Sequence, residues 1–72
     1  MLIREGKVSE IKVRWLGKTG VAFDHGKIYK AVAYLPEENL ISVIDESNED
    51  YLYMPSSFEL LGNVDDLPQH ID

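Results

Sequence analysis

Four carboxylates lie close together in the chain, at Asp45, Glu46, Glu49 and Asp50. Carboxylate oxygens are the ligands that Ca²⁺ prefers, but a calcium loop of the EF-hand type needs glycine at its sixth position and glutamate at its twelfth. Counted from Asp45, those positions hold Asp50 and Ser56. We therefore expect at most weak, non-specific cation binding and no dedicated metal site. The structural alternative is a solvated hairpin in which Asp45 or Asp50 caps the amides of the turn.

A second motif, Gly17-Lys18-Thr19, has the residue types of a phosphate-binding loop. That loop needs a further glycine five positions before its second glycine, where this chain has Lys12, and it needs a helix directly after it. Neither His25 nor His70 has another histidine three or four residues away, and cysteine is absent, so we expect no transition-metal site. No serine, histidine and aspartate pattern stands out, and we expect a non-enzymatic protein without a cofactor.

Aromatic side chains are the remaining group that could recognise a ligand. Barrels that bind nucleic acid combine exposed aromatic rings with a basic surface. This chain has a formal net charge of -6, so we expect no direct binding of nucleic acid. Eukaryotic SH3 domains bind polyproline helices in an aromatic groove, but their early Ala-Leu-Tyr-Asp-Tyr segment is absent here. The aromatic residues are Trp15, Phe23, Tyr29, Tyr34, Tyr51, Tyr53 and Phe58.

The composition is that of a small acidic chain. It has 72 residues, of which 44% are hydrophobic, 7 are lysine or arginine and 13 are aspartate or glutamate. A chain of this size buries only about 60% of the surface that it exposes when unfolded, so its core needs most of the large apolar side chains. No apolar run approaches the roughly 18 residues that span a bilayer, and Arg4 and Glu5 interrupt any apolar leader. We expect a cytoplasmic protein without a membrane partner.

The charges are divided unevenly along the chain. Residues 1–36 contain all 7 basic residues and three acids, a net charge of +4, whereas residues 37–72 contain ten acids and no lysine or arginine, a net charge of -10. Such asymmetry can indicate a polyelectrolyte partner or an acidic tail. It is partly neutralised if the fold brings Lys27 and Lys30 close to Asp45 and Glu46 across a sheet. If the net charge then recognises a partner, we expect it to do so through the acids left unpaired in the turns and the tail, and the plain alternative is that the acidity only keeps the protein soluble.

Strand patterns dominate the chain. In residues 10–16, Ile11, Val13 and Trp15 alternate with two basic residues, the period-two pattern of a strand with one buried face. The following loop holds a short apolar patch at residues 21–23, which we expect to anchor the loop on the core. The expected strands are residues 10–16, 28–35, 40–45, 50–54 and 58–61, with a 3₁₀ turn at 55–57.

Two tight turns connect the central strands, at residues 36–39 and 46–49, and their Asn39 and Asn48 tolerate left-handed backbone geometry. Five short strands, a long loop after the first and one 3₁₀ turn before the last predict an all-β fold, a small five-stranded SH3-like barrel. We predict a single domain at residues 1–62, in which residues 1–9 form an N-terminal extension. Residues 63–72 form an acidic C-terminal tail, which either frays or docks through its few apolar side chains.

Tyr51 and Tyr53 share one face of their strand, and Leu52 lies on the other. If Leu52 is buried, the two tyrosines are exposed and form a contact patch with Tyr34. If the tyrosines are buried, they are core residues with hydroxyls at the rim. The second arrangement is favoured, because so short a chain needs their area for its core.

Three segments of the chain resemble a widespread group of small bacterial and phage proteins common in Firmicutes. They are Gly26-Lys27-Ile28-Tyr29, then Asp45-Glu46-Ser47-Asn48-Glu49-Asp50-Tyr51-Leu52-Tyr53, and then Phe58-Glu59. In that group glycine stands in the place of Asn48, and the tyrosine is followed directly by proline, whereas Met54 intervenes here. The resemblance covers about two-thirds of the chain. It implies an SH3-like barrel and no particular activity.

These observations favour a protein-interaction module with an unknown protein partner, acting as a monomer or a homodimer. The candidate interaction residues are Tyr34, Tyr51, Tyr53, Glu46, Glu49 and Asp50. Two alternatives remain open at this point. One is an acidic mimic of nucleic acid, or a phage-type modulator, that binds a basic host protein. The other is an accessory domain that associates with itself through an edge strand.

Overall fold

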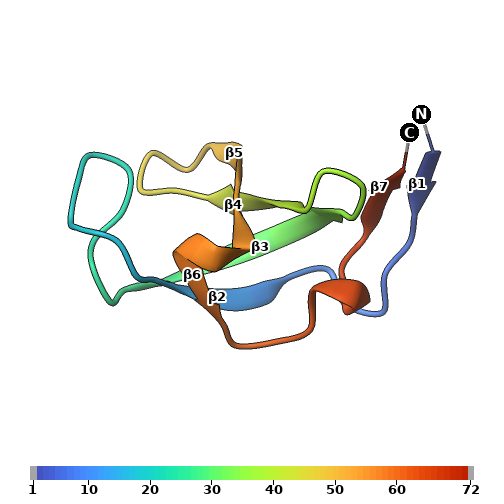
Figure 1. Ribbon diagram of the computed structural model, residues 1–72, viewed down its shortest axis with the longest axis horizontal. Coiled ribbons are helices and arrows are strands. Elements are labelled where there is room, and N and C mark those ends of the chain that lie inside the picture. Colours follow the sequence, from blue (N-terminus) through green and yellow to red (C-terminus); the bar gives the residue numbers. More distant parts are fainter. Residues whose placement is uncertain (1, 72) are drawn as a thin grey trace.

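The computed structural model describes residues 2–71, which form one connected sheet of seven strands with two 3₁₀ turns and no α-helix (Figure 1). The all-β prediction is confirmed, but the predicted number of five strands is too low. The strands are β1 (Leu2–Arg4), β2 (Ile11–Trp15), β3 (Ile28–Leu35), β4 (Leu40–Ile44), β5 (Asp50–Tyr53), β6 (Phe58–Leu60) and β7 (Gln69–Ile71). The 3₁₀ turns are η1 (Pro55–Ser57) and η2 (Val64–Asp66).

The five strands predicted from sequence are β2 to β6, and η1 lies where it is predicted. The alternation of apolar and polar residues predicted these strands correctly, because it follows their two faces. In β2, for example, Ile11 and Val13 are buried and Lys12 between them is exposed. Both asparagines adopt the expected left-handed geometry, with φ of 55° at Asn39 and 62° at Asn48. Turn chemistry therefore fixes the register of the β3–β4 and β4–β5 hairpins.

Five strands follow one another across the sheet in the order β5-β4-β3-β2-β6, and all of these neighbours are antiparallel. The eight-residue strand β3 is the central strand, and a register shift between Ala31 and Ala33 bends it. Strand β5 pairs only with β4, and β6 pairs only with β2, so the sheet is open within residues 2–71. The rings of Tyr53 and Phe58 meet across this opening, with 6.0 Å between their centroids.

Both ends of the chain join the sheet at one end of the molecule. Strand β1 pairs with β7, and β7 touches the end of β3 in a parallel pairing between Gln69 and Tyr34 (Figure 1). The turn η2 is capped by Asn63, whose side chain accepts the Asp65 N–H at 2.9 Å. Leu67, which follows this turn, has 0% exposure. The predicted tail thus docks as far as residue 71, and the two predicted flanking segments lie together.

The core lies between the curled sheet and the loops that cover it. Its fully buried large side chains are Val13, Ile41, Val43 and Leu67, from β2, β4 and the segment after η2. Burying one such side chain contributes about 1.5–3 kcal/mol. Three of the four come from the strands predicted from sequence, while Leu67 comes from the segment that the sequence leaves outside the barrel.

Of the two lysines expected to pair with the acids of the β4–β5 hairpin, Lys27 does so and Lys30 does not. Lys27 Nζ lies 2.8 Å from Glu46 Oε1, which is the predicted contact between the two halves of the chain. Lys30 Nζ instead lies 3.9 Å from Glu10. Arg14 pairs with Glu59, which lies directly opposite it on β6. These exposed pairs are each worth about 0–1 kcal/mol, so they neutralise charge more than they stabilise the fold.

Candidate functional site

An aromatic cluster lies at the end of the molecule remote from the chain termini. Trp15 at the end of β2 stacks on Phe23 of the long loop at residues 16–27, with 4.7 Å between ring centroids and 22° between planes. Phe23 also meets Tyr53 of β5 edge-on, with a centroid distance of 5.0 Å. Stacked and edge-to-face pairs are the favourable arrangements of aromatic rings. Three separate segments are therefore joined through the ring of Phe23.

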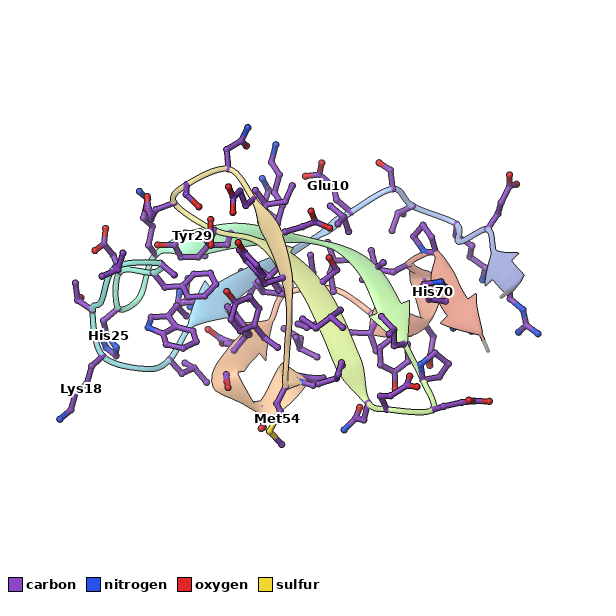
Figure 2. The ribbon with its side chains drawn as sticks, turned by 90° about the horizontal axis from the view of Figure 1, so that it is seen from above. Glu10, Lys18, His25, Tyr29, Met54 and His70 are labelled. Atoms are coloured by element: carbon purple, nitrogen blue, oxygen red, sulfur yellow. The ribbon has the colours of Figure 1, made fainter. Side chains whose placement is uncertain are left out.

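A pocket of about 290 Å³ opens over this cluster, and Phe23, Trp15 and Tyr53 contribute its aromatic surface. The loop forms its other side with Lys18, Gly20, Val21 and Ala22. Phe23 is buried, whereas Val21 is fully exposed. A concave surface lined mainly by aromatic and aliphatic side chains is the usual form of a ligand site. Figure 2 shows the side chain of Lys18 pointing outward from the same loop.

Hydrogen bonds hold the pocket side of the loop in place. Trp15 Nε1 donates to the Lys18 carbonyl at 2.9 Å, and the Gly20 N–H donates to the Phe23 carbonyl at 2.8 Å. His25 Nδ1 donates to the Gly17 carbonyl at 2.8 Å, which assigns a proton to that nitrogen. These bonds hold the loop in one conformation, and a surface that is already ordered loses less entropy when it binds a ligand.

A polar network joins the loop to the β4–β5 turn. The Tyr29 hydroxyl accepts the Asp24 N–H at 2.7 Å and donates to Glu46 Oε2 at 3.2 Å. The Glu46 N–H donates to the Ala22 carbonyl at 3.0 Å. Figure 2 shows Tyr29 extending toward the loop that carries His25. The acidic turn therefore supports the segment that carries Phe23.

The network shifts the pKa values of its members. The hydrogen bond and charge of Lys27 hold the pKa of Glu46 below its ordinary value, and Glu46 in turn raises the pKa of Lys27. Burial raises the pKa of the Tyr29 and Tyr53 hydroxyls. Around neutral pH the two tyrosines are thus neutral and the Lys27–Glu46 pair is charged.

The candidate tyrosines lie on the core side of the sheet, because Tyr53 faces Ile41 and Tyr51 faces Val43 across the β4–β5 pairing. Tyr53 is half-buried and packs against the core, in line with the favoured arrangement. It also lines the pocket, which the sequence did not predict. Tyr51 is 51% exposed, so its prediction as a core residue is wrong. Its side chain lies on the core face of the sheet, as predicted. It is exposed because β5 is an edge strand and no further strand of residues 2–71 beside it covers the ring. Its hydroxyl donates to Glu49 at 2.5 Å, and this bond raises its pKa.

The other candidate residues do not reach the pocket. Tyr34 is half-buried at the end of β3 near β7, and its hydroxyl donates to Asn39 Oδ1 at 3.3 Å. Asp50 accepts a hydrogen bond of 3.1 Å from the Ser42 hydroxyl. Glu46 and Glu49 are engaged in the contacts described above. The structure thus brings only Tyr53, out of the predicted set, to the pocket.

The carboxylate of Asp45 caps the β4–β5 turn, as the structural alternative to a calcium site requires. Its Oδ1 accepts the Ser47 N–H at 2.9 Å, the Ser47 hydroxyl at 2.6 Å and the Glu49 N–H at 3.4 Å. These bonds, led by that of the Ser47 hydroxyl, lower the pKa of Asp45. Between residues 2 and 71, no three histidine, cysteine or acidic side chains are grouped so that they could hold a metal ion.

Apart from Tyr53, the residues that line the pocket were not among the candidates; they are Trp15, Lys18, Gly20, Val21, Ala22 and Phe23. The sequence indicates the apolar patch at residues 21–23, and Phe23 anchors the loop on the core as expected. Val21 does not, because it points into solvent. A short apolar patch within a polar loop is the signal that could have identified this site.

No helix in the described part of the chain is long and apolar enough to cross a membrane. A comparison of the chain with protein-family models, with curated proteins and with solved structures finds no match. The resemblance to the Firmicute and phage proteins therefore stays a prediction.

Proposed function

We propose that this chain is a small SH3-like barrel, a non-enzymatic protein-interaction module of the cytoplasm that binds an apolar side chain of a partner protein in the pocket over Phe23. The observation that carries the proposal is the fully exposed Val21 at the rim of a pocket lined by Trp15 and Tyr53. Tryptophan and tyrosine are the residues that most often dominate the binding energy of protein interfaces.

The strand order and connections support the SH3-like part of the proposal. In chain order, β2 is followed by the long loop, tight turns connect β3 to β4 and β4 to β5, and η1 comes directly before β6, while the order across the sheet is β5-β4-β3-β2-β6. These are the features from which the sequence predicts such a barrel. The pocket lies between that long loop and β5, in the concave position where small-molecule and peptide sites usually form.

The chemistry of the pocket supports binding rather than catalysis. Its described lining contains Lys18 and Tyr53 as the ionisable groups, and the other lining residues are aromatic, aliphatic or glycine. Such a surface gains free energy by excluding water from an apolar partner side chain, at about 25 cal/mol per Å² of apolar area. The mimic of nucleic acid has less support, because Asp45 and Glu46 use their carboxylates within the fold.

A comparative pull-down tests this function. The wild-type chain, a Val21→Asp variant and a Val8→Asp control are immobilised, and proteins retained from an extract of the producing cells are identified by mass spectrometry. Val8 is exposed and its backbone lies against η2, away from the pocket. We expect a partner that wild type and the Val8 variant retain and the Val21 variant loses. Retention of the same proteins by all three chains, or of background alone, contradicts the proposal.

A further inference from the structure

Strand β5 has a free edge. It pairs with β4 on one side and with no strand of residues 2–71 on the other. The Asp45 N–H donates to the Glu49 carbonyl at 3.0 Å, so these two residues form a hydrogen-bonded pair at the start of the hairpin. Such pairs alternate along an antiparallel ladder. The main-chain N–H and C=O groups of Asp50 and Leu52 therefore point away from β4, toward the free edge.

Beside the exposed Asp50, three apolar side chains at or just beyond this edge are open to solvent. Tyr51 is 51% exposed, Leu52 is 50% exposed and Met54 is 60% exposed. Natural proteins usually protect an edge strand with lysine, proline or an inward charge, because unpaired main-chain groups invite another strand. Here the nearest proline is Pro55, which lies beyond the strand, and no lysine or arginine occurs after Lys30. The edge is left available over the length of β5.

The charges around the edge select the type of strand that would pair with it. The hairpin carries Asp45, Glu46, Glu49 and Asp50 and no basic residue. Because Asp45 caps the turn and Glu46 pairs with Lys27, Glu49 and Asp50 are the acids that remain beside the edge. The one basic contact recorded for these acids within residues 2–71 is Lys27 with Glu46. A second copy of the chain would bring the same acids and a further net charge of -6 to this edge. A basic segment instead places opposite charges across the new pairing, which is stabilising.

We propose that the free edge of β5 takes up an extended, basic segment of a partner protein as an added strand, with lysine or arginine facing Asp50 and an apolar residue facing Leu52. Main-chain hydrogen bonds to Asp50 and Leu52 supply affinity in this mode, and alternate side chains supply specificity. The inference takes from the proposed function only that the partner is a protein. It uses the edge of the sheet rather than the aromatic pocket.

An NMR titration tests the inference. The probe is an acetylated and amidated decapeptide of alternating lysine and valine, and its twin carries glutamate in place of lysine. We expect the lysine peptide to shift the amide resonances of Asp50–Tyr53 and the glutamate peptide to leave them unchanged. A Leu52→Pro variant removes an outward N–H without touching the β4 ladder. It should weaken binding about tenfold or more, since it loses edge hydrogen bonds.

The matched control is Leu60→Pro on the other edge of the sheet. The Leu61 N–H donates to the Lys12 carbonyl, so by the same alternation the Leu60 N–H points away from β2. This variant should bind the lysine peptide as wild type does. A second variant, Asp50→Lys, keeps the test valid if Leu52→Pro does not fold. It should reverse the preference, so that the glutamate peptide binds better than the lysine peptide.

Three results would overturn the inference. The first is an absence of saturable binding of the lysine peptide. The second is binding that Leu52→Pro and Asp50→Lys leave unchanged and Val21→Asp abolishes, which places the peptide in the pocket and leaves the proposed function intact. The third is a dimer of the free chain in sedimentation equilibrium that Leu52→Pro disperses, because the edge is then occupied by a second copy. If the Val21→Asp variant loses its partner in the pull-down, that result concerns only the pocket. It neither supports nor contradicts the binding of a strand at the β5 edge.

Discussion

The indole ring of Trp15 and the phenyl ring of Phe23 stack with 4.7 Å between their centroids, and this contact joins strand β2 to the loop that forms the candidate pocket. Such a pair contributes about 0.5–1.5 kcal/mol beyond the area it buries. Phe23 is buried, while Trp15 and Tyr53 remain partly open to solvent beside it. The shape of the pocket therefore depends on the position of the indole.

Replacing Gly17 by alanine is expected to displace that indole. A Cβ at position 17 would lie 2.4 Å from Cζ2 of Trp15, which is closer than van der Waals contact allows. The stack on Phe23 and the bond from Nε1 to Lys18 oppose any movement of the ring. We expect a loss of about 1–3 kcal/mol in the free energy of unfolding, as for an overpacked core. Urea denaturation followed by tryptophan fluorescence measures it.

The Gly20→Ala variant is the matched control, because a Cβ there meets no atom within 4 Å. It should leave stability unchanged or raise it slightly, since alanine restricts the unfolded chain. Equal stabilities for the Gly17 and Gly20 variants would show that the indole does not occupy the position described.

The hydroxyl of Tyr29 is expected to stabilise the loop. Tyr29→Phe removes the acceptor of the Asp24 N–H and the donor to Glu46 from a buried ring. We expect a loss of about 1–2 kcal/mol in the free energy of unfolding, the range for a hydrogen bond whose partners are left unpaired. Tyr34→Phe is the control, because that hydroxyl makes an exposed 3.3 Å bond to Asn39. If both substitutions cost the same, the network around Tyr29 has no special role.

Stability should fall in acid partly through Glu46. The bond and charge of Lys27, with a further bond from Tyr29, hold the folded pKa of this carboxyl below its ordinary value of 4.5. A lowered folded pKa gives stability that is present above the unfolded pKa and lost as the pH falls through the folded one. Thermal unfolding between about pH 6 and pH 3 should therefore depend less on pH in Glu46→Gln than in wild type. Glu37→Gln, in an exposed turn, should keep the wild-type dependence, and an identical slope in all three chains would contradict this account.

The two ends of the chain should contribute to stability together. A Cβ on Gly6 would lie 2.2 Å from the Asp66 carbonyl oxygen, which is backbone and cannot move aside cheaply. Gly6→Ala should therefore lower the free energy of unfolding by about 2 kcal/mol or more. Glu5→Ala, at an exposed neighbour, is the control. Wild-type stability of the Gly6 variant in thermal unfolding would mean that the segment around Gly6 does not pack against η2.

The strands β2 to β6 were predictable because alternation and turn residues are local signals. Ile11 and Val13 mark the buried face of β2, and Asn39 and Asn48 mark the two tight turns. Strands β1 and β7 were not predictable in this way. Each has three residues, too few for a period, and their pairing joins Leu2 to Ile71 from opposite ends of the chain.

The pocket could be predicted only in part. The sequence places Tyr53 on the core face and marks residues 21–23 as an apolar patch. Which member of the patch is buried depends on how the loop folds back on Trp15, and that is a tertiary contact. The same is true of Tyr51. The alternation of residues predicts which face of the strand its side chain lies on, but it does not predict that β5 is an edge strand. Sequence periodicity thus specifies faces, whereas exposure on a face depends on the neighbouring elements.

The central claim is that the pocket over Phe23 binds a partner through its apolar rim, and one calorimetric comparison tests it most directly. A peptide selected from a displayed library against the wild-type chain is titrated into wild type, Val21→Asp and Val8→Asp. Both substituted residues are exposed, so all three chains should unfold at similar temperatures. We predict that Val21→Asp weakens binding about tenfold or more and that Val8→Asp leaves it unchanged. Equal affinities for wild type and Val21→Asp would contradict the claim.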